Sequence, residues 1–192
     1  RILAAKGIHY AWFMAFISFI LLIFSSSAMS TPAILMLPII EAFGWSITDV
    51  SAIIGALFII VAVAAPFGTA FMLRLGLTKI VVISCVLLVT GLSLTTLAFE
   101  KWHLFFSIGT LLGLASGILG LGFAATVATR WFVEKRGLVL GILAASWAAG
   151  QILLVPFIAW IVSEFDWQYG VVPGVSGAVV CLILFVLFGK NW

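Results

Sequence analysis

Six long apolar stretches, separated by short polar breaks, account for almost the whole chain. They cover residues 9–33, 48–72, 80–99, 103–129, 137–162 and 168–189. A helix that crosses the hydrocarbon core of a bilayer needs about 20 predominantly apolar residues, because each residue adds about 1.5 Å. Every stretch meets that length. The pattern therefore predicts an all-α, polytopic membrane protein, with six transmembrane helices that form one unit over residues 1–192.

Composition agrees with this pattern and excludes a soluble protein. Hydrophobic residues make up 65% of the chain and charged residues 8%, whereas a soluble domain carries about 25% charged residues. The formal net charge of +3 is not gathered on a polar domain, so we expect no nucleic-acid partner. The first residue is Arg1 instead of a methionine, which leads us to expect a fragment of a longer protein.

Basic residues lie almost entirely on one side of the predicted membrane. The two termini and the connections after the second and fourth stretches contain eight of them: Arg1, Lys6, Arg74, Lys79, Arg130, Lys135, Arg136 and Lys190. The connections on the other side contain a single base, Lys101, and five of the six acids. Because cytoplasmic loops carry an excess of Lys and Arg, we predict that both termini of this segment are cytoplasmic.

Small residues recur at helical spacing in the fourth and fifth stretches. Gly109, Gly113 and Gly117 follow one another at intervals of four, and Gly141 and Gly150 extend the pattern into the fifth stretch. Helices in a bilayer associate largely by close packing of such residues. We therefore predict grooves that neighbouring backbones enter. The same glycines suit plain packing and a sliding contact equally, and the sequence does not separate the two.

Uncharged polar side chains are the candidates for a binding cavity, because no ionisable residue lies deep within a stretch. The candidates are Ser26, Ser30, Ser116, Trp147 and Gln151. Ser26 and Ser30 share a helical face, and so do Trp147 and Gln151. A serine hydroxyl can instead bond to a carbonyl of its own helix, but a glutamine amide cannot satisfy all its groups there. We predict that the five candidate side chains line a water-filled or ligand-lined cavity. Burial against another helix is the alternative.

The sequence offers no catalytic constellation. A rhomboid-type serine protease would need a Gly-x-Ser-Gly stretch and a buried histidine. Ser116 instead lies in GLASG, one residue out of register, and both His9 and His103 lie at membrane edges. No metal-ligand cluster, phosphate-binding loop or haem-ligand pair occurs deep in the stretches. We therefore expect that the protein is not an enzyme and that it needs no metal or cofactor.

Three segments carry a family resemblance. They are EAFGWSITDVSA (41–52), APFGTAFMLRLGLTK (65–79) and RWFVEKRGLVLGI (130–142). The first resembles the outer connection between helices 1 and 2 of the monocarboxylate and oxalate/formate-antiporter-like branch of the major facilitator superfamily. The other two resemble the cytoplasmic 2–3 and 4–5 loops of that branch. The resemblance covers essentially the whole chain, as the N-terminal six-helix half of such a transporter.

The resemblance implies a set of loop residues at a cytoplasmic gate: Pro66, Arg74, Gly76, Arg130, Arg136 and Gly137. The chain departs from the general superfamily signature at two positions. Leu73 stands where an acidic residue usually precedes the loop arginine, and Thr78 stands where a basic residue is common. These departures put an Asp–Arg lock of the gate in question.

The resemblance also implies a function and partners. We expect half of a secondary transporter or antiporter that moves a small organic anion, a carboxylate, by alternating access between two halves. The expected partners are a second six-helix half after Trp192, membrane lipid and the anion, in a bacterial inner (plasma) membrane. The alternative is a self-contained six-helix assembly or accessory subunit without transport activity. Six further spans beyond Trp192 would favour the transporter, and a stop codon there would favour the alternative.

Overall fold

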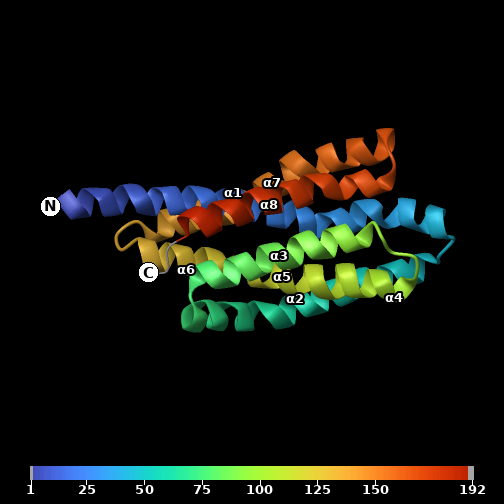
Figure 1. Ribbon diagram of the computed structural model, residues 1–192, viewed down its shortest axis with the longest axis horizontal. Helices are drawn as coiled ribbons and strands as arrows, with labels where there is room; N and C mark the ends of the chain where they lie inside the picture. Colours follow the sequence, from blue (N-terminus) through green and yellow to red (C-terminus); the bar gives the residue numbers. More distant parts are fainter. Residues whose placement is uncertain (1, 190–192) are drawn as a thin grey trace.

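Long helices run side by side through the molecule. The computed structural model describes the backbone of residues 2–189 and the side chains of residues 10–189. Helices α1 (Ile2–Phe43), α2 (Ile47–Leu75) and α3 (Leu77–Thr95) are followed by a segmented fourth span, then by α7 (Arg136–Glu164) and by the final pair η2 (Trp167–Val171) and α8 (Val172–Phe188). Six helices of the described part are long and apolar enough to cross a membrane, which confirms the predicted spans (Figure 1).

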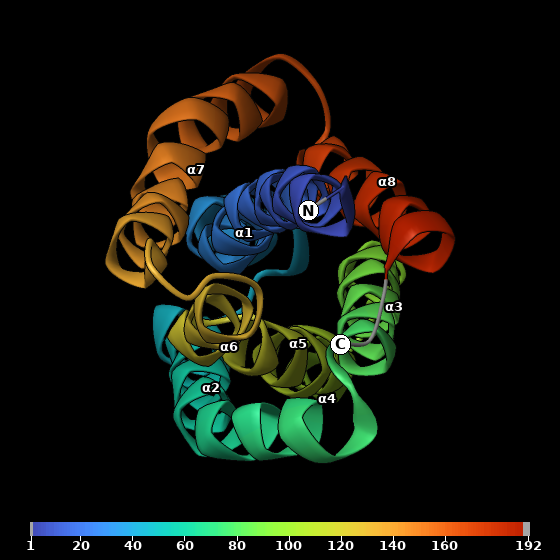
Figure 2. The same cartoon turned by 90° about the vertical axis from the view of Figure 1, so that its left-hand side faces the viewer.

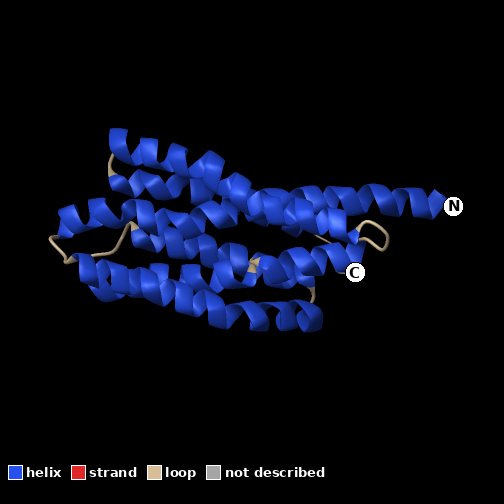
Figure 3. Cartoon of the chain, turned by 180° about the vertical axis from the view of Figure 1, so that it is seen from behind, coloured by secondary structure: helices blue, strands red, loops and turns tan. Residues whose placement is uncertain are grey.

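The fourth span is not the single regular helix that its apolar pattern predicts. It consists of α4 (Lys101–Leu104), the π-helix η1 (Phe105–Leu112), α5 (Gly113–Ile118) and α6 (Leu121–Trp131). Leu119 and Gly120 leave the helical conformation between α5 and α6. Figure 3 shows this break inside a bundle whose other loops lie at its ends. Glycine has low helix propensity, and four glycines between residues 113 and 122 weaken this segment.

Two of the six spans lie inside the arrangement, and the other four flank them in two pairs (Figure 2). Figure 2 shows α1 and the fourth span in the middle, with α2 and α7 on one side and α3 and α8 on the other. Over its most apolar window, 56% of the residues are buried in both α1 and the fourth span, against 22% in α2 and in α7. The chain therefore presents two largely uncovered helices, α2 and α7, that flank an interior pair.

Close glycine contacts hold α2 against the fourth span. A Cβ added to Gly117 would lie 2.7 Å from the Val61 carbonyl oxygen, and one on Gly68 would lie 2.8 Å from the Ile118 Cα. Gly113 meets Ile60 at 3.1 Å, but Gly109 has only ordinary contacts, the nearest at 3.7 Å. Gly113 and Gly117 therefore let the two backbones approach, as the glycine pattern predicts.

In α7 the two glycines of the predicted packing pattern have different surroundings. A Cβ on Gly150 would overlap the Ser26 hydroxyl and the Ile23 carbonyl of α1, so this glycine is where α1 and α7 meet most closely. Gly141 is exposed, and no atom lies within 4 Å of an added Cβ. None of the described helices packs at Gly141, because this residue lies on the face of α7 turned away from α1.

Candidate functional site

The polar side chains at the middle of α7 form the candidate site. Trp147 is half-buried and Gln151 is exposed, and they lie one turn apart near the centre of a 29-residue helix. Among the described residues, neither side chain has a hydrogen-bond partner. The structure thus leaves the Gln151 amide, with its two donors and its acceptor oxygen, open at mid-depth.

An open amide at that depth restricts what can cover this face of α7. Within the hydrocarbon core there is no water to satisfy polar groups, and an unsatisfied one costs several kcal/mol. Contact of Gln151 with lipid tails would therefore be unfavourable. This side of α7 fits a water-filled cavity or another protein surface that supplies hydrogen bonds.

The structure brings Ser26 and Ser30 of α1 beside α7, although both hydroxyls serve their own helix. Ser26 donates to the Ile23 carbonyl at 3.0 Å, and Ser30 donates to the Ser26 carbonyl at 3.2 Å. Ser26 is fully buried, whereas Ser30 is half-buried. Within this half the Ser26 hydroxyl lines no open surface, because the close approach at Gly150 covers it.

Ser116 is also buried within this half. It lies in α5 with 1% of its surface exposed, and its hydroxyl has no hydrogen-bond partner in the described part of the chain. It is packed inside the half instead of lying on the face that carries Gln151. Of the five predicted cavity residues, Ser30, Trp147 and Gln151 remain reachable.

The predicted gate residues other than Pro66, which lies inside α2, are found at one end of the bundle. This is the end where both described termini, the α2–α3 connection and residues 130–136 are found, and we call it the basic end (Figure 1). Gly76 alone connects α2 to α3. Its backbone φ angle is 96°, a conformation that favours glycine. The guanidinium of Arg130 reaches the Leu73 carbonyl at 3.5 Å.

The remaining signature residues have separate places. Arg74 is exposed in the last turn of α2, and none of the described residues forms an ion pair with it. Arg136 donates from its Nε to the Val133 carbonyl at 2.9 Å, so it closes the turn that leads into α7. Gly137 and Pro66 are exposed. The contact between Arg130 and the Leu73 carbonyl thus joins the end of α6 to the end of α2.

A contact at the opposite end was not predicted. The Ser46 hydroxyl accepts from the Asp49 amide at 3.2 Å and caps α2, and Lys101 donates to the Asp49 carboxylate at 2.6 Å. The capping pattern Ser-x-x-Asp is visible in the sequence, but the partner Lys101 is 52 residues away. Because this pair is exposed, it joins the first and third connections without adding much stability.

Comparison with known proteins gives a consistent result. A family model described as Major Facilitator Superfamily matches residues 12–191. Among curated proteins, the chain is 32% identical over 107 residues to monocarboxylate transporter 11 of Mus musculus, 28% over 142 residues to monocarboxylate transporter 9 of Mus musculus, and 21% over 160 residues to monocarboxylate transporter 7 of Homo sapiens. These matches cover 55%, 73% and 83% of the chain, but 23%, 28% and 30% of the relatives. The chain thus spans less than a third of each relative.

Proposed function

The chain belongs to the major facilitator superfamily, and we propose that it forms one half of a secondary transporter that moves a small carboxylate anion by alternating access. The observation that carries this proposal is the exposed, unpartnered Gln151 amide at the middle of α7. Substrate sites of such transporters lie near the midplane, between two halves. The relatives are named as monocarboxylate transporters, which supports a carboxylate as the substrate class.

The proposed arrangement assigns a task to each part of this half. The uncovered faces of α2 and α7 meet a second six-helix half, and the side of α7 with Trp147 and Gln151 borders the cavity between them. The backbone contacts at Gly117 and Gly150 tie α2 and α7 to the interior spans, so this half moves as one body. The Gln151 amide donates to a carboxylate oxygen, and the side chains that carry positive charge for the anion lie in the other half.

The experiment that tests the function is a flux measurement on the full-length protein containing this chain. Purified protein in proteoliposomes is offered radiolabelled acetate, lactate and pyruvate, with glucose and choline as neutral and cationic controls. We expect saturable uptake of at least one monocarboxylate and none of the controls. Preloading with unlabelled anion separates antiport, which it stimulates, from uniport. Folded protein without flux of any monocarboxylate would contradict the proposal and favour an accessory subunit.

We further propose that the protein lies in a bacterial plasma membrane and that its basic end is on the cytoplasmic side. Single cysteines placed in the exposed loops, at Val133 on the basic end and at Phe99 on the opposite end, should react with a membrane-impermeant maleimide from the inside and the outside of cells, respectively. Neutralising Arg74, Lys79, Arg130, Lys135 and Arg136 together should yield mixed orientations, because each base helps to retain its loop inside. Labelling of Val133→Cys from outside in the otherwise unaltered protein would overturn this orientation.

A further inference from the structure

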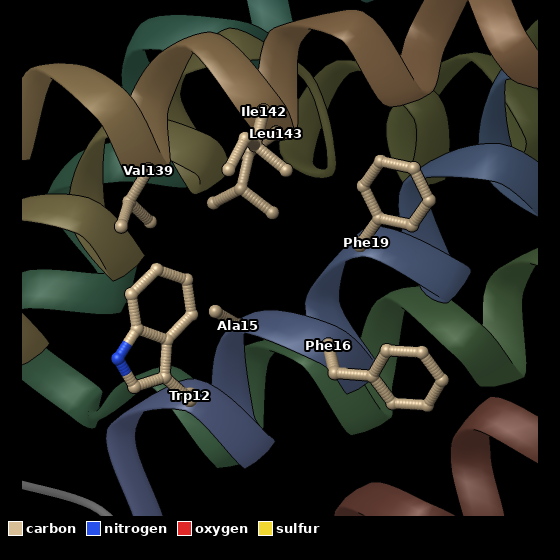
Figure 4. Close-up of a pocket in the computed structure, with 7 residues that line it drawn as sticks. All are labelled: Trp12, Ala15, Phe16, Phe19, Val139, Ile142 and Leu143. Atoms are coloured by element: carbon tan, nitrogen blue, oxygen red, sulfur yellow. The ribbon is translucent and has the colours of Figure 1, made fainter. Parts of the chain in front are cut away.

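An apolar pocket, open on one side, lies between α1 and α7 in the basic-end half of the molecule. Trp12, Phe16 and Phe19 of α1 form one side, and Val139, Ile142 and Leu143 of α7 form the other, with Ala15 at the floor (Figure 4). Its volume is about 280 Å³. A dry cavity of about 150 Å³ already admits benzene. This pocket is therefore large enough for a segment of a hydrocarbon chain, and its lining is almost entirely apolar.

Basic residues stand directly beyond the end of this pocket. Arg136 lies one turn before Val139 on the same face of α7. Lys135 precedes Arg136 and is the N-cap residue of the helix. The turn that carries them is fixed to the pocket wall, because the Phe132 ring packs edge-on against Trp12 with 5.2 Å between centroids. Glu134 is the acid in this turn, and like both bases it is exposed, so the local balance is positive.

The opening of the pocket faces away from the candidate site. Ile142 and Gln151 are nine residues apart in α7, which places them on opposite sides of the helix, about 180° apart at 3.6 residues per turn. Figure 4 shows α7 and α1 bordering the pocket, with the fourth span and α2 behind it. If the Gln151 side meets the second half, as proposed above, the Ile142 side meets lipid.

We propose that this pocket binds one anionic phospholipid from the leaflet at the basic end. One acyl chain enters between Phe16 and Ile142, and the phosphate lies at Lys135 and Arg136. Apolar burial along the chain and attraction to the two bases act on the same molecule. Tight binding requires both the apolar pocket and the two bases. A free phosphate has no acyl chain to enter the pocket, and a lipid without net charge is not attracted to the bases.

The test measures lipid retention by the purified full-length protein with native mass spectrometry. The protein is titrated with dioleoylphosphatidylglycerol, dioleoylphosphatidylcholine or inorganic phosphate. We expect one phosphatidylglycerol to bind at least ten-fold more tightly than phosphatidylcholine, since each nearby base contributes about five-fold. Lys135→Gln and Arg136→Gln should each remove about five-fold. Arg136→Lys should retain the preference because it keeps the charge, and so should Lys79→Gln, in the first turn of α3 at the same end of the bundle.

Pocket-filling variants locate the acyl chain. Ala15→Trp, and independently Ile142→Trp at the exposed rim, should weaken phosphatidylglycerol binding at least ten-fold, whereas Val180→Trp on the exposed face of α8 should not. Equal retention of the two lipids, displacement by inorganic phosphate, or unchanged retention in Ile142→Trp would each overturn the proposal. The last result would indicate that protein from the second half occupies the pocket. Because retention is measured without flux, its failure is distinguishable from a failure of the transport function.

Discussion

Replacing Gly150 by alanine is expected to lower the thermal stability of the protein, whereas the same replacement at Gly141 is expected to raise it. At Gly150 the new Cβ would overlap the Ile23 carbonyl oxygen, which belongs to the backbone of α1 and cannot turn aside. Forcing an extra carbon into such a contact costs about 1–3 kcal/mol. At Gly141 no atom lies within 4 Å, so the alanine contributes only its better helix propensity, about 0.5–1 kcal/mol.

The measurement is thermal unfolding of the full-length protein, followed by tryptophan fluorescence and by the fraction that remains monodisperse after heating. Gly117→Ala serves as a second buried position, since its Cβ would lie 2.7 Å from the Val61 carbonyl oxygen. The opposite signs at two glycines of one helix are the decisive feature. A similar loss of stability at Gly141 would mean that this face of α7 is also tightly packed, and a gain at Gly150 would mean that α1 and α7 are further apart than in this structure.

Replacing Gln151 by leucine is expected to weaken binding of the transported carboxylate by about five- to thirty-fold, which corresponds to the 1–2 kcal/mol of one lost hydrogen bond. The melting temperature should not fall, because the Gln151 amide is exposed and bonds to none of the described residues. Trp147→Ala should likewise change affinity more than stability if the indole borders the same cavity. Affinity is taken from competition among the anions that proteoliposomes accumulate.

Two controls separate a site role from a general disturbance. Gln168→Leu makes the same chemical change at an exposed position at the far end of the bundle and should leave affinity unaltered. In intact membranes, Gln151→Cys should react with a hydrophilic maleimide and be protected by substrate, whereas Val180→Cys on α8 should not react. Native Cys85 and Cys181 are buried and should stay silent. Lost stability with unchanged affinity in both Gln151→Leu and Trp147→Ala would remove this pair from the site.

Features set by the local pattern could be predicted from the sequence. Six apolar stretches at bilayer length predict six spans, and in five of them the helix ends lie within a few residues of the predicted ends. The exception is α1, which runs to Phe43 instead of residue 33. The glycines of the fourth span predict close packing, and Gly113 and Gly117 provide it. The placement of Gln151 at mid-depth follows from its distance to the helix ends alone.

Which neighbour each face meets was decided only by the tertiary structure. Gly141 and Gly150 look alike in the sequence, yet only Gly150 lies against α1, since nine residues turn the helix by about half a revolution more than whole turns. Ser26 and Ser116 are buried while Gln151 is open, and the pocket at Trp12 is formed by side chains of α1 and α7 that are at least 120 residues apart in the chain. Helical periodicity and bilayer thickness act along the chain and are readable from it. The direction of a face depends on contacts between distant segments, which a uniformly apolar, glycine-rich sequence does not distinguish.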